Sequence, residues 1–258
     1  MLITTAVVPG PPGFVAELMG SAAHELDDLR HAADCVVSRA VFDLVAASAH
    51  SPSSGSVSAQ VIVVGPGQPG EFNATGPVSF ASFGRDVVVP ALVEGQRCDR
   101  ELPTPLMVAR YLASRDIATH PEHAQLWAAA RWITTNGADA AALGEHLRAD
   151  GTRIGLILVA DGASCHGPKA PRAQDARAQA YDDGVCAALA SGQPGRLAQI
   201  DVGLGDELGA TGPQVWPVLL AAAGSDGIGE VLWSGAPYGV GWAVATWRPG
   251  TSATVPQA

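Results

Sequence analysis

The sequence predicts an α/β protein in which a central mixed sheet is flanked by helices on both faces. Three short apolar runs, at residues 2–8, 60–64 and 154–160, are separated by longer segments with helical periodicity. Continuous apolar runs of this length are typical of strands that are covered on both faces. Residues 230–233 and 239–247 instead predict a β-hairpin around the turn SGAPYG, which makes the sheet mixed.

The first part of the chain predicts strand, turn and helix in that order. The first strand, residues 2–8, stops at the turn PGPPG. Residues 14–45 predict an amphipathic helix, because apolar side chains recur every four positions at Phe14, Leu18, Ala22 and Leu26. The second strand, residues 60–64, ends at the turn GPGQPG, and residues 73–94 predict an irregular loop with a short strand at VVVP.

The remainder of the chain predicts five helices around the third strand. They are expected at residues 103–114, 121–135, 136–150, 174–190 and 213–223. The helix over 121–135 depends on Leu126, Trp127 and Ile133, and the next helix is expected to begin near Asn136. Because no internal repeat or break in composition divides the chain, we expect one domain over residues 1–258.

The charge distribution limits the partners of the protein. The formal net charge is −10, and no run of Lys and Arg is present. Nucleic acid is therefore not an expected partner, because phosphate binding needs clustered cations. The N-terminal segment lacks the basic start of a signal peptide, and no apolar run is long enough to span a membrane, so we expect a cytoplasmic protein. The sequence is also compatible with a homo-oligomer.

The four cysteines are widely spaced and form no CxxC pair. A zinc ribbon or a redox pair needs such close pairs, so this spacing favours reduced thiols.

Candidate reactive residues follow the third strand, where the sequence continues DGASCH. In an α/β sheet, ligands bind beyond the carboxyl ends of the strands, so this loop is a candidate site. Asp161, Ser164 and His166 supply the residue types of a catalytic triad. Residues two or three apart in one loop rarely converge, however, which disfavours a triad, and Asp161 is expected to satisfy N–H groups of the loop.

A second candidate is a metal site at His24, Asp28 and His31, which would share one helix face at i, i+4 and i+7. The segment HELDDLRH is equally typical of a solvated helical face, which we favour. A metal site at His120 and His123 is disfavoured, because these residues flank a predicted helix start, where charged residues are common. The segment VGLGDELG has the wrong spacing for a dinucleotide-binding loop.

The segments VADGASCHGPKAP and SGAPYGVGWAVATW resemble the B-subunit-like (LigB-like) proteins of the class III extradiol ring-cleavage dioxygenase superfamily, in particular a group from actinobacteria. The resemblance covers most of the chain, because PPGFVAELMG, VIVVGPG and the terminal APYGVGW also occur in the expected order. It implies an extradiol dioxygenase B-subunit-like fold.

Active members of that superfamily hold non-haem Fe(II) with two histidines and one carboxylate, and use a further histidine for acid–base catalysis. The resemblance places the first ligand at Gly10, within Pro9–Pro12, and the second near Gly67. Neither glycine can bind a metal. His166 corresponds to the catalytic histidine with an offset, and Glu230 precedes the strand where a carboxylate ligand would be expected.

The resemblance therefore implies a degenerate dioxygenase-like protein with no cofactor, which binds a small aromatic or carboxylate compound in a vestigial cleft. His166 and Asp161 are its vestigial catalytic candidates, and the residues expected to line the cleft are Gly10, Pro11, Gly67, Ser164, Lys169 and Tyr238. The alternative is an active Fe(II) dioxygenase in which His24 and His31 act as relocated ligands.

Overall fold

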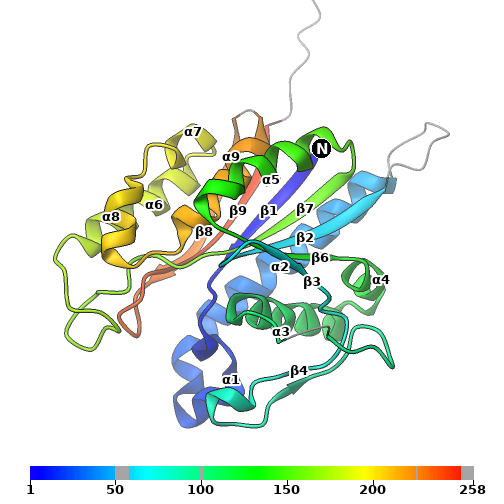
Figure 1. Ribbon diagram of the computed structural model, residues 1–258, viewed down its shortest axis with the longest axis horizontal. Helices are drawn as coiled ribbons and strands as arrows, with labels where there is room; N and C mark the ends of the chain where they lie inside the picture. The colour runs from blue at the N-terminus through cyan, green and yellow to red at the C-terminus, as the bar shows by residue number, and fades with distance from the viewer. Residues whose placement is uncertain (50–57, 99–100, 225, 251–258) are drawn as a thin grey trace, which may run out of the picture.

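The computed structural model describes residues 1–49, 58–98, 101–224 and 226–250. These residues form a seven-stranded sheet with the strand order β3-β6-β2-β7-β1-β9-β8 (Figure 1). The strands are β1 Leu2–Val8, β2 Ala59–Pro66, β3 Gly70–Phe72, β6 Arg131–Thr135, β7 Arg153–Val159, β8 Gly227–Gly235 and β9 Trp242–Pro249. A separate two-stranded sheet pairs β4 Val78–Ser79 with β5 Val88–Val89.

The main sheet is mixed, as the sequence predicts. Strands β1, β2, β6 and β7 are mutually parallel, whereas β3 pairs antiparallel with β6 and β9 pairs antiparallel with both β1 and β8. The three predicted apolar strands are the adjacent strands β2, β7 and β1 at the centre of the sheet. The predicted C-terminal hairpin is also confirmed, since β8 and β9 pair along their length.

Two hydrophobic cores lie on opposite faces of this sheet. Along β2, Val61 and Val63 pack into one core and Ile62 and Val64 into the other, because successive side chains of a strand point to opposite faces. Helices α2 Asp27–Ala49 and α3 Thr104–Thr119 cover the first core. Helices α5 Gly137–Ala149, α6 Ala178–Ala190 and α9 Trp216–Ala223 cover the second (Figure 1).

The prediction of one helix over residues 121–135 is wrong. A short helix, α4 Ala124–Ala128, follows the turn Pro121–His123, and the chain then enters β6. Leu126 and Trp127 lie in α4, but Ile133 lies in the strand. The segment RWITT is rich in aromatic and β-branched residues, which fit the buried position between β2 and β3 better than a helix.

The expected helix over residues 14–45 is interrupted. Short 3-10 turns at Pro12–Phe14 and Gly20–Leu26 flank α1 Ala16–Met19, and the long helix α2 begins only at Asp27. Gly20 has a φ of 56°, a conformation that a glycine adopts readily and that ends α1. His24 and His31 therefore do not share one continuous α-helix.

The other helices begin close to the expected positions. Asn136 caps α5 by accepting hydrogen bonds from the N–H groups of Ala138 and Asp139, at 3.1 and 3.3 Å. The segment VGLGDELG forms the short helix α8 Val202–Leu208, and another short helix, α7 Pro194–Leu197, precedes it. Neither was expected from the sequence.

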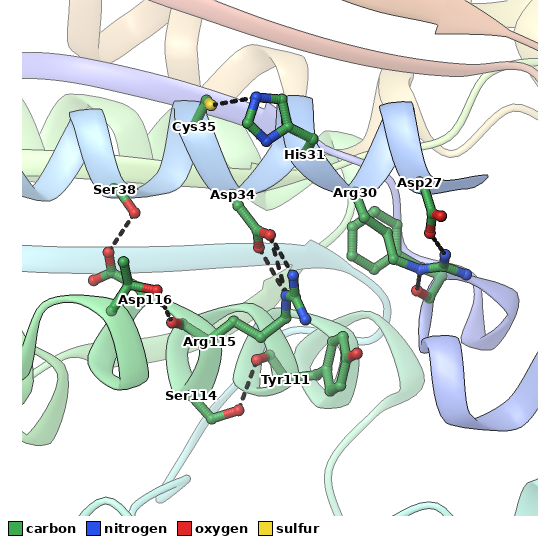
Figure 2. A network of polar contacts seen from close by, with 12 residues as sticks. Asp27, Arg30, His31, Asp34, Cys35, Ser38, Tyr111, Ser114, Arg115 and Asp116 are labelled. Carbon is green, nitrogen blue, oxygen red and sulfur yellow. Dashed lines mark hydrogen bonds and ion pairs between the residues drawn. The ribbon is translucent and has the colours of Figure 1, made fainter. Parts of the chain in front are cut away.

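Polar contacts join α2 to α3 on the first face of the sheet (Figure 2). Arg115 forms an ion pair with Asp34, and Ser38 donates a hydrogen bond of 2.6 Å to the buried Asp116. Asp116 also accepts hydrogen bonds from His123 and Trp127, at 2.9 and 2.7 Å. These three donors compensate the buried carboxylate and connect α3 to α2 and α4.

No helix among the described residues is both long and apolar enough to cross a membrane. The four cysteines are free thiols.

Candidate functional site

The candidate site lies at the carboxyl ends of β1 and β7, which are neighbours in the sheet. The register pairs Val8 with Val159, and the N–H of Ala160 donates to the carbonyl of Val8 at 2.9 Å. The loops after these two strands therefore leave the same edge of the sheet side by side. This edge is where ligands bind in parallel α/β sheets.

Asp161 connects three loops at this edge. Its carboxylate accepts a hydrogen bond of 3.0 Å from the N–H of Gly10. Its own N–H donates to the hydroxyl of Thr211 at 2.9 Å, and its carbonyl accepts from the N–H groups of Thr211 and Gly212. Burial raises the pKa of the Asp161 carboxyl to about 6, although the Gly10 N–H lowers it in part. The expected role of Asp161 as a loop-organising residue is therefore accompanied by a perturbed carboxyl group.

The loop after β7 is hydrogen-bonded to the turn of the C-terminal hairpin. Gly162 donates to the carbonyl of Gly241 at 2.7 Å, and Gly241 donates to the carbonyl of Ala163 at the same distance. His166 then donates its backbone N–H to the carbonyl of Gly239 at 3.0 Å. These bonds hold the DGASCH loop and the hairpin turn together as one wall of the site.

Asp182, on α6, fits into a space that two glycines leave in this wall. A side chain at Gly162 or Gly241 would overlap with the Asp182 carboxylate. The carboxylate accepts hydrogen bonds from the Ala163 N–H at 3.0 Å and from Nε2 of His166 at 2.6 Å. Burial raises the pKa of Asp182, against the opposing effect of these two donors.

His166 is thereby oriented by Asp182. In the neutral imidazole, donation from Nε2 leaves Nδ1 as the acceptor nitrogen. Among the described residues Nδ1 has no hydrogen-bond partner. The pair is mostly buried, with 12% of the His166 side chain and 14% of the Asp182 side chain exposed. This arrangement resembles the general base and the orienting carboxylate of an acid–base site. No serine or cysteine in the described part of the chain forms a hydrogen bond to the imidazole.

A cavity of about 120 Å³ opens beside this pair. We call it the Asp182 cavity. Its lining comes from β1, from the loop after β7, from α6 and α9, and from the hairpin. The residues are Val7, Ala160, Asp161, Gly162, His166, Gln179, Asp182, Asp183, Val185, Cys186, Trp216, Ser234, Gly235, Ala236, Gly241, Trp242 and Ala243.

The glycines expected to line a cleft lie outside this cavity. Gly10 is buried, and a Cβ atom at this position would lie 2.8 Å from Cγ1 of Val159 and 3.6 Å from Cα of Pro105. Pro11 is half-buried and directly precedes the first 3-10 turn. Gly67 lies beyond β2, where its N–H donates to Thr135 of β6. Pro105, at the beginning of α3, lies 3.6 Å from the place of a Cβ atom at Gly10 and 3.0 Å from that at Gly65, so α3 begins beside the ends of β1 and β2.

The remaining expected lining residues also lie elsewhere. Ser164 donates its hydroxyl to the carbonyl of Leu208 at 3.3 Å, and Lys169 is exposed. Tyr238 donates to Glu25 at 3.0 Å and contacts the edge of the Trp242 ring. Of the eight residues predicted for the site, Asp161 and His166 line the Asp182 cavity, and the other six do not.

The histidines considered as relocated metal ligands do not converge. His24 is exposed, and its Nδ1 lies 2.8 Å from the carbonyl of Ser21. His31 is on the side of α2 that points away from α3, where its ring lies beside Cys35 (Figure 2). Within residues 1–49, 58–98, 101–224 and 226–250, no group of three or more His, Cys, Asp or Glu side chains is placed to hold a metal ion.

No protein-family model matches the chain, and no curated protein matches it at significant similarity. Among solved structures, the chain is similar to the crystal structure of an uncharacterized protein from Escherichia coli K12. The two share 13% sequence identity with a TM-score of 0.43, over 95% of this chain and 99% of that chain. A similarity at this level carries no argument about activity.

Proposed function

We propose that this protein binds a small organic molecule in the Asp182 cavity, as a metal-free, degenerate relative of the class III extradiol dioxygenases. The observation that carries the proposal is the position of the cavity. It lies beyond the carboxyl ends of two parallel strands and contains Asp161 and the oriented His166–Asp182 pair. An apolar cavity with a few convergent polar groups and a perturbed pKa is typical of a ligand-binding site.

The residues at the expected iron site do not fit Fe(II). Non-haem iron needs a facial set of imidazole and carboxylate ligands. Glycine stands at positions 10 and 67, and Val159 and Pro105 surround the place where a side chain at position 10 would begin. We therefore assign no step of chemistry to a bound metal.

The volume of the cavity limits the size of the ligand. A cavity of about 150 Å³ in another protein holds benzene. By comparison with that volume, a compound of about six non-hydrogen atoms is the largest that lies wholly inside the Asp182 cavity, and a larger one would extend past its exposed rim at Gln179, Asp183 and Ser234.

A fragment screen by ligand-detected NMR tests the proposal. We expect fragments of this size to bind the natural chain and to be excluded by Ser234→Trp, which places a bulky ring at the exposed rim of the cavity. Glu230→Trp is the matched control, because Glu230 is exposed on the same strand and does not line the cavity. If no fragment distinguishes Ser234→Trp from Glu230→Trp, the proposal is wrong.

Loading with Fe(II) under anaerobic conditions, followed by metal analysis, tests the alternative reading. We expect far less than one iron per chain. One tightly held iron per chain, lost in His24→Ala or His31→Ala and accompanied by cleavage of catechols, would instead establish an active dioxygenase with relocated ligands.

The oriented imidazole favours acid–base catalysis as a second candidate function. Asp182 fixes Nε2 of His166, which leaves Nδ1 able to accept a proton from a bound molecule. Conversion of a ligand from the fragment screen, abolished by His166→Gln while the ligand still binds, would establish this activity.

Because the four cysteines are free, we also propose that the protein acts in the cytoplasm. That the protein forms a homo-oligomer stays a prediction.

A further inference from the structure

One exposed side of α2 carries an imidazole and a thiol that lie side by side. His31 and Cys35 are four residues apart in α2, and both are exposed. Residues at this spacing lie above one another on one face of a helix. Nε2 of His31 lies 3.7 Å from Sγ of Cys35 (Figure 2). Neither residue lines the Asp182 cavity, so the pair is a separate feature of the protein.

The rest of α2 holds the backbone under this pair in place. The side of the helix that faces the sheet is buried in the first core. Asp34 and Ser38, from the same stretch of α2, bind Arg115 and Asp116 of α3 (Figure 2). Side chains on a firmly packed helix keep their relative positions better than side chains on a loop. The helix therefore keeps the imidazole and the thiol close together.

The separation of the two side chains matches the geometry of zinc. Zn²⁺ binds thiolate sulfur at about 2.3 Å and imidazole nitrogen at about 2.0–2.1 Å, in a tetrahedral arrangement. Two such bonds at the tetrahedral angle place the sulfur and the nitrogen roughly 3.6 Å apart. The distance of 3.7 Å between Nε2 of His31 and Sγ of Cys35 therefore agrees with one edge of a zinc tetrahedron.

The chemistry of the two ligands favours zinc over harder cations. Thiolate and imidazole groups suit Zn²⁺, whereas Mg²⁺ and Ca²⁺ prefer oxygen ligands. Fe²⁺ binds a given set of such ligands more weakly than Zn²⁺ does. The pair therefore does not change the expectation that the protein takes up far less than one iron per chain.

We propose that His31 and Cys35 form a two-ligand site for Zn²⁺ on the exposed side of α2. The thiol releases its proton to the solvent as the zinc–sulfur bond forms, and the neutral imidazole donates the lone pair of Nε2 to the ion. Because both side chains are exposed, the other two positions of the tetrahedron are open to water or to donor groups of another molecule. A closed structural site differs, since there the protein fills all four positions.

Protection of thiols from alkylation tests this proposal. The natural chain is treated with iodoacetamide near neutral pH, with and without saturating Zn²⁺, and each cysteine-containing peptide is quantified by mass spectrometry. We expect Zn²⁺ to slow the alkylation of Cys35 at least about 10-fold, because the ion occupies the sulfur that attacks the reagent. Cys98 and Cys186, which are half-buried, are controls in the same sample and should react at unchanged rates. Mg²⁺ should protect none of them.

Two histidine variants locate the nitrogen ligand. In His31→Ala, the Zn²⁺ concentration that half-protects Cys35 should rise at least about 10-fold, since the loss of even an outer-shell partner lowers metal affinity by about 10- to 100-fold. His24→Ala is the matched control, because His24 is also exposed and its Nδ1 lies beside the carbonyl of Ser21. It should leave the protection unchanged. The pair of variants also separates this site from the alternative iron site, which needs His24 and does not use Cys35.

Cobalt spectroscopy identifies the sulfur ligand directly. Co²⁺ in place of Zn²⁺ should give the near-ultraviolet charge-transfer band of a thiolate–cobalt bond in the natural chain, and Cys35→Ser should lose this band. Cys186→Ser is the control and should keep it. Zinc that does not slow the alkylation of Cys35, equal protection of all the cysteines, protection that survives His31→Ala, or a cobalt band that survives Cys35→Ser would each overturn the proposal. The site does not depend on the Asp182 cavity, so each of these results leaves the outcome of the fragment screen unaffected.

Discussion

The carboxylate of Asp182 occupies the space in which a side chain at Gly241 would begin. The two residues come from α6 and from the C-terminal hairpin, and their contact brings Asp182 within 2.6 Å of His166. The absence of a Cβ atom at position 241 is therefore a requirement for the His166–Asp182 pair.

Gly241→Ala should displace Asp182 and destabilise the protein. Overpacking of a buried site costs about 1–3 kcal/mol, and displacement of the carboxylate would also break its bonds to Ala163 and His166. Urea denaturation measures the loss. Gly195→Ala is the control, because a Cβ atom there has no neighbour within 4 Å. An equal effect of the two substitutions would contradict the close fit of Asp182.

Asp161 should make the protein less stable as the pH rises from about 4 to 6. Burial raises the pKa of this carboxyl from its ordinary value of 3.8 to about 6 in the folded state. In this range the folded state binds more protons than the unfolded state, so the free energy of unfolding falls with increasing pH. A shift of this size corresponds to at most about 3 kcal/mol.

Asp161→Asn should abolish this part of the pH dependence. The variant should gain stability relative to the natural protein above pH 6, and the gain should vanish below pH 4. Denaturation curves recorded between pH 4 and 8 give the comparison. A stability difference that does not vary with pH would show that Asp161 ionises normally.

Asp116→Asn should destabilise the contact between α2 and α3. Asp116 accepts hydrogen bonds from Ser38, His123 and Trp127 in a buried position, and an amide has one oxygen to offer them. The amide can donate its NH₂ group to the Ser38 hydroxyl, but its hydrogen bonds to His123 and Trp127 lose the negative charge of the carboxylate, and the loss costs about 1–3 kcal/mol because hydrogen bonds to charged groups are stronger than neutral ones. The measurement is the free energy of unfolding at pH 7.

The matched control is Asp34→Asn, which weakens the neighbouring ion pair with Arg115 (Figure 2). This pair is partly exposed, with 40% of the Arg115 side chain and 28% of the Asp34 side chain accessible, so its loss should cost less than about 1 kcal/mol. If Asp34→Asn proved more harmful than Asp116→Asn, the greater importance that we give to the buried bonds would be refuted.

Gly10→His combined with Gly67→His should not restore an iron site. The new side chain at position 10 would begin 2.8 Å from Cγ1 of Val159, in a buried position. We expect reduced stability and no stoichiometric Fe(II) uptake under anaerobic conditions. The single variant Gly67→His shows how much of the loss of stability comes from position 67 and how much from position 10. Uptake of one iron per chain by the double variant would show that the ends of β1 and β2 can still open.

Much of the sheet could be predicted from the sequence because its central strands are buried on both faces. β1, β2 and β7 are continuous apolar runs for this reason. β6 was not recognised, since RWITT follows the helix-forming segment AQLWAAA without a glycine or proline between them. The interruption near Gly20 was missed because the four-residue apolar repeat continues through the 3-10 turns.

The site could be predicted only in part. Asp161 and His166 were found because they directly follow a recognisable strand. Asp182 was not found, since the pair of aspartates in α6 has the pattern of a solvated helical surface, and only the folded hairpin buries one of them. The glycine positions were expected to line a cleft because the sequence does not reveal that α3 begins beside the ends of β1 and β2.

The strand order has a consequence for when the Asp182 cavity forms. β9 pairs with β1, so the last strand of the sheet completes contacts with the first. The Asp182 cavity takes residues from both strands and from the turn before β9. During synthesis, a chain that has not yet reached residue 249 therefore has most of its sheet but no complete cavity. The cavity is completed at the end of folding, when the hairpin docks beside β1.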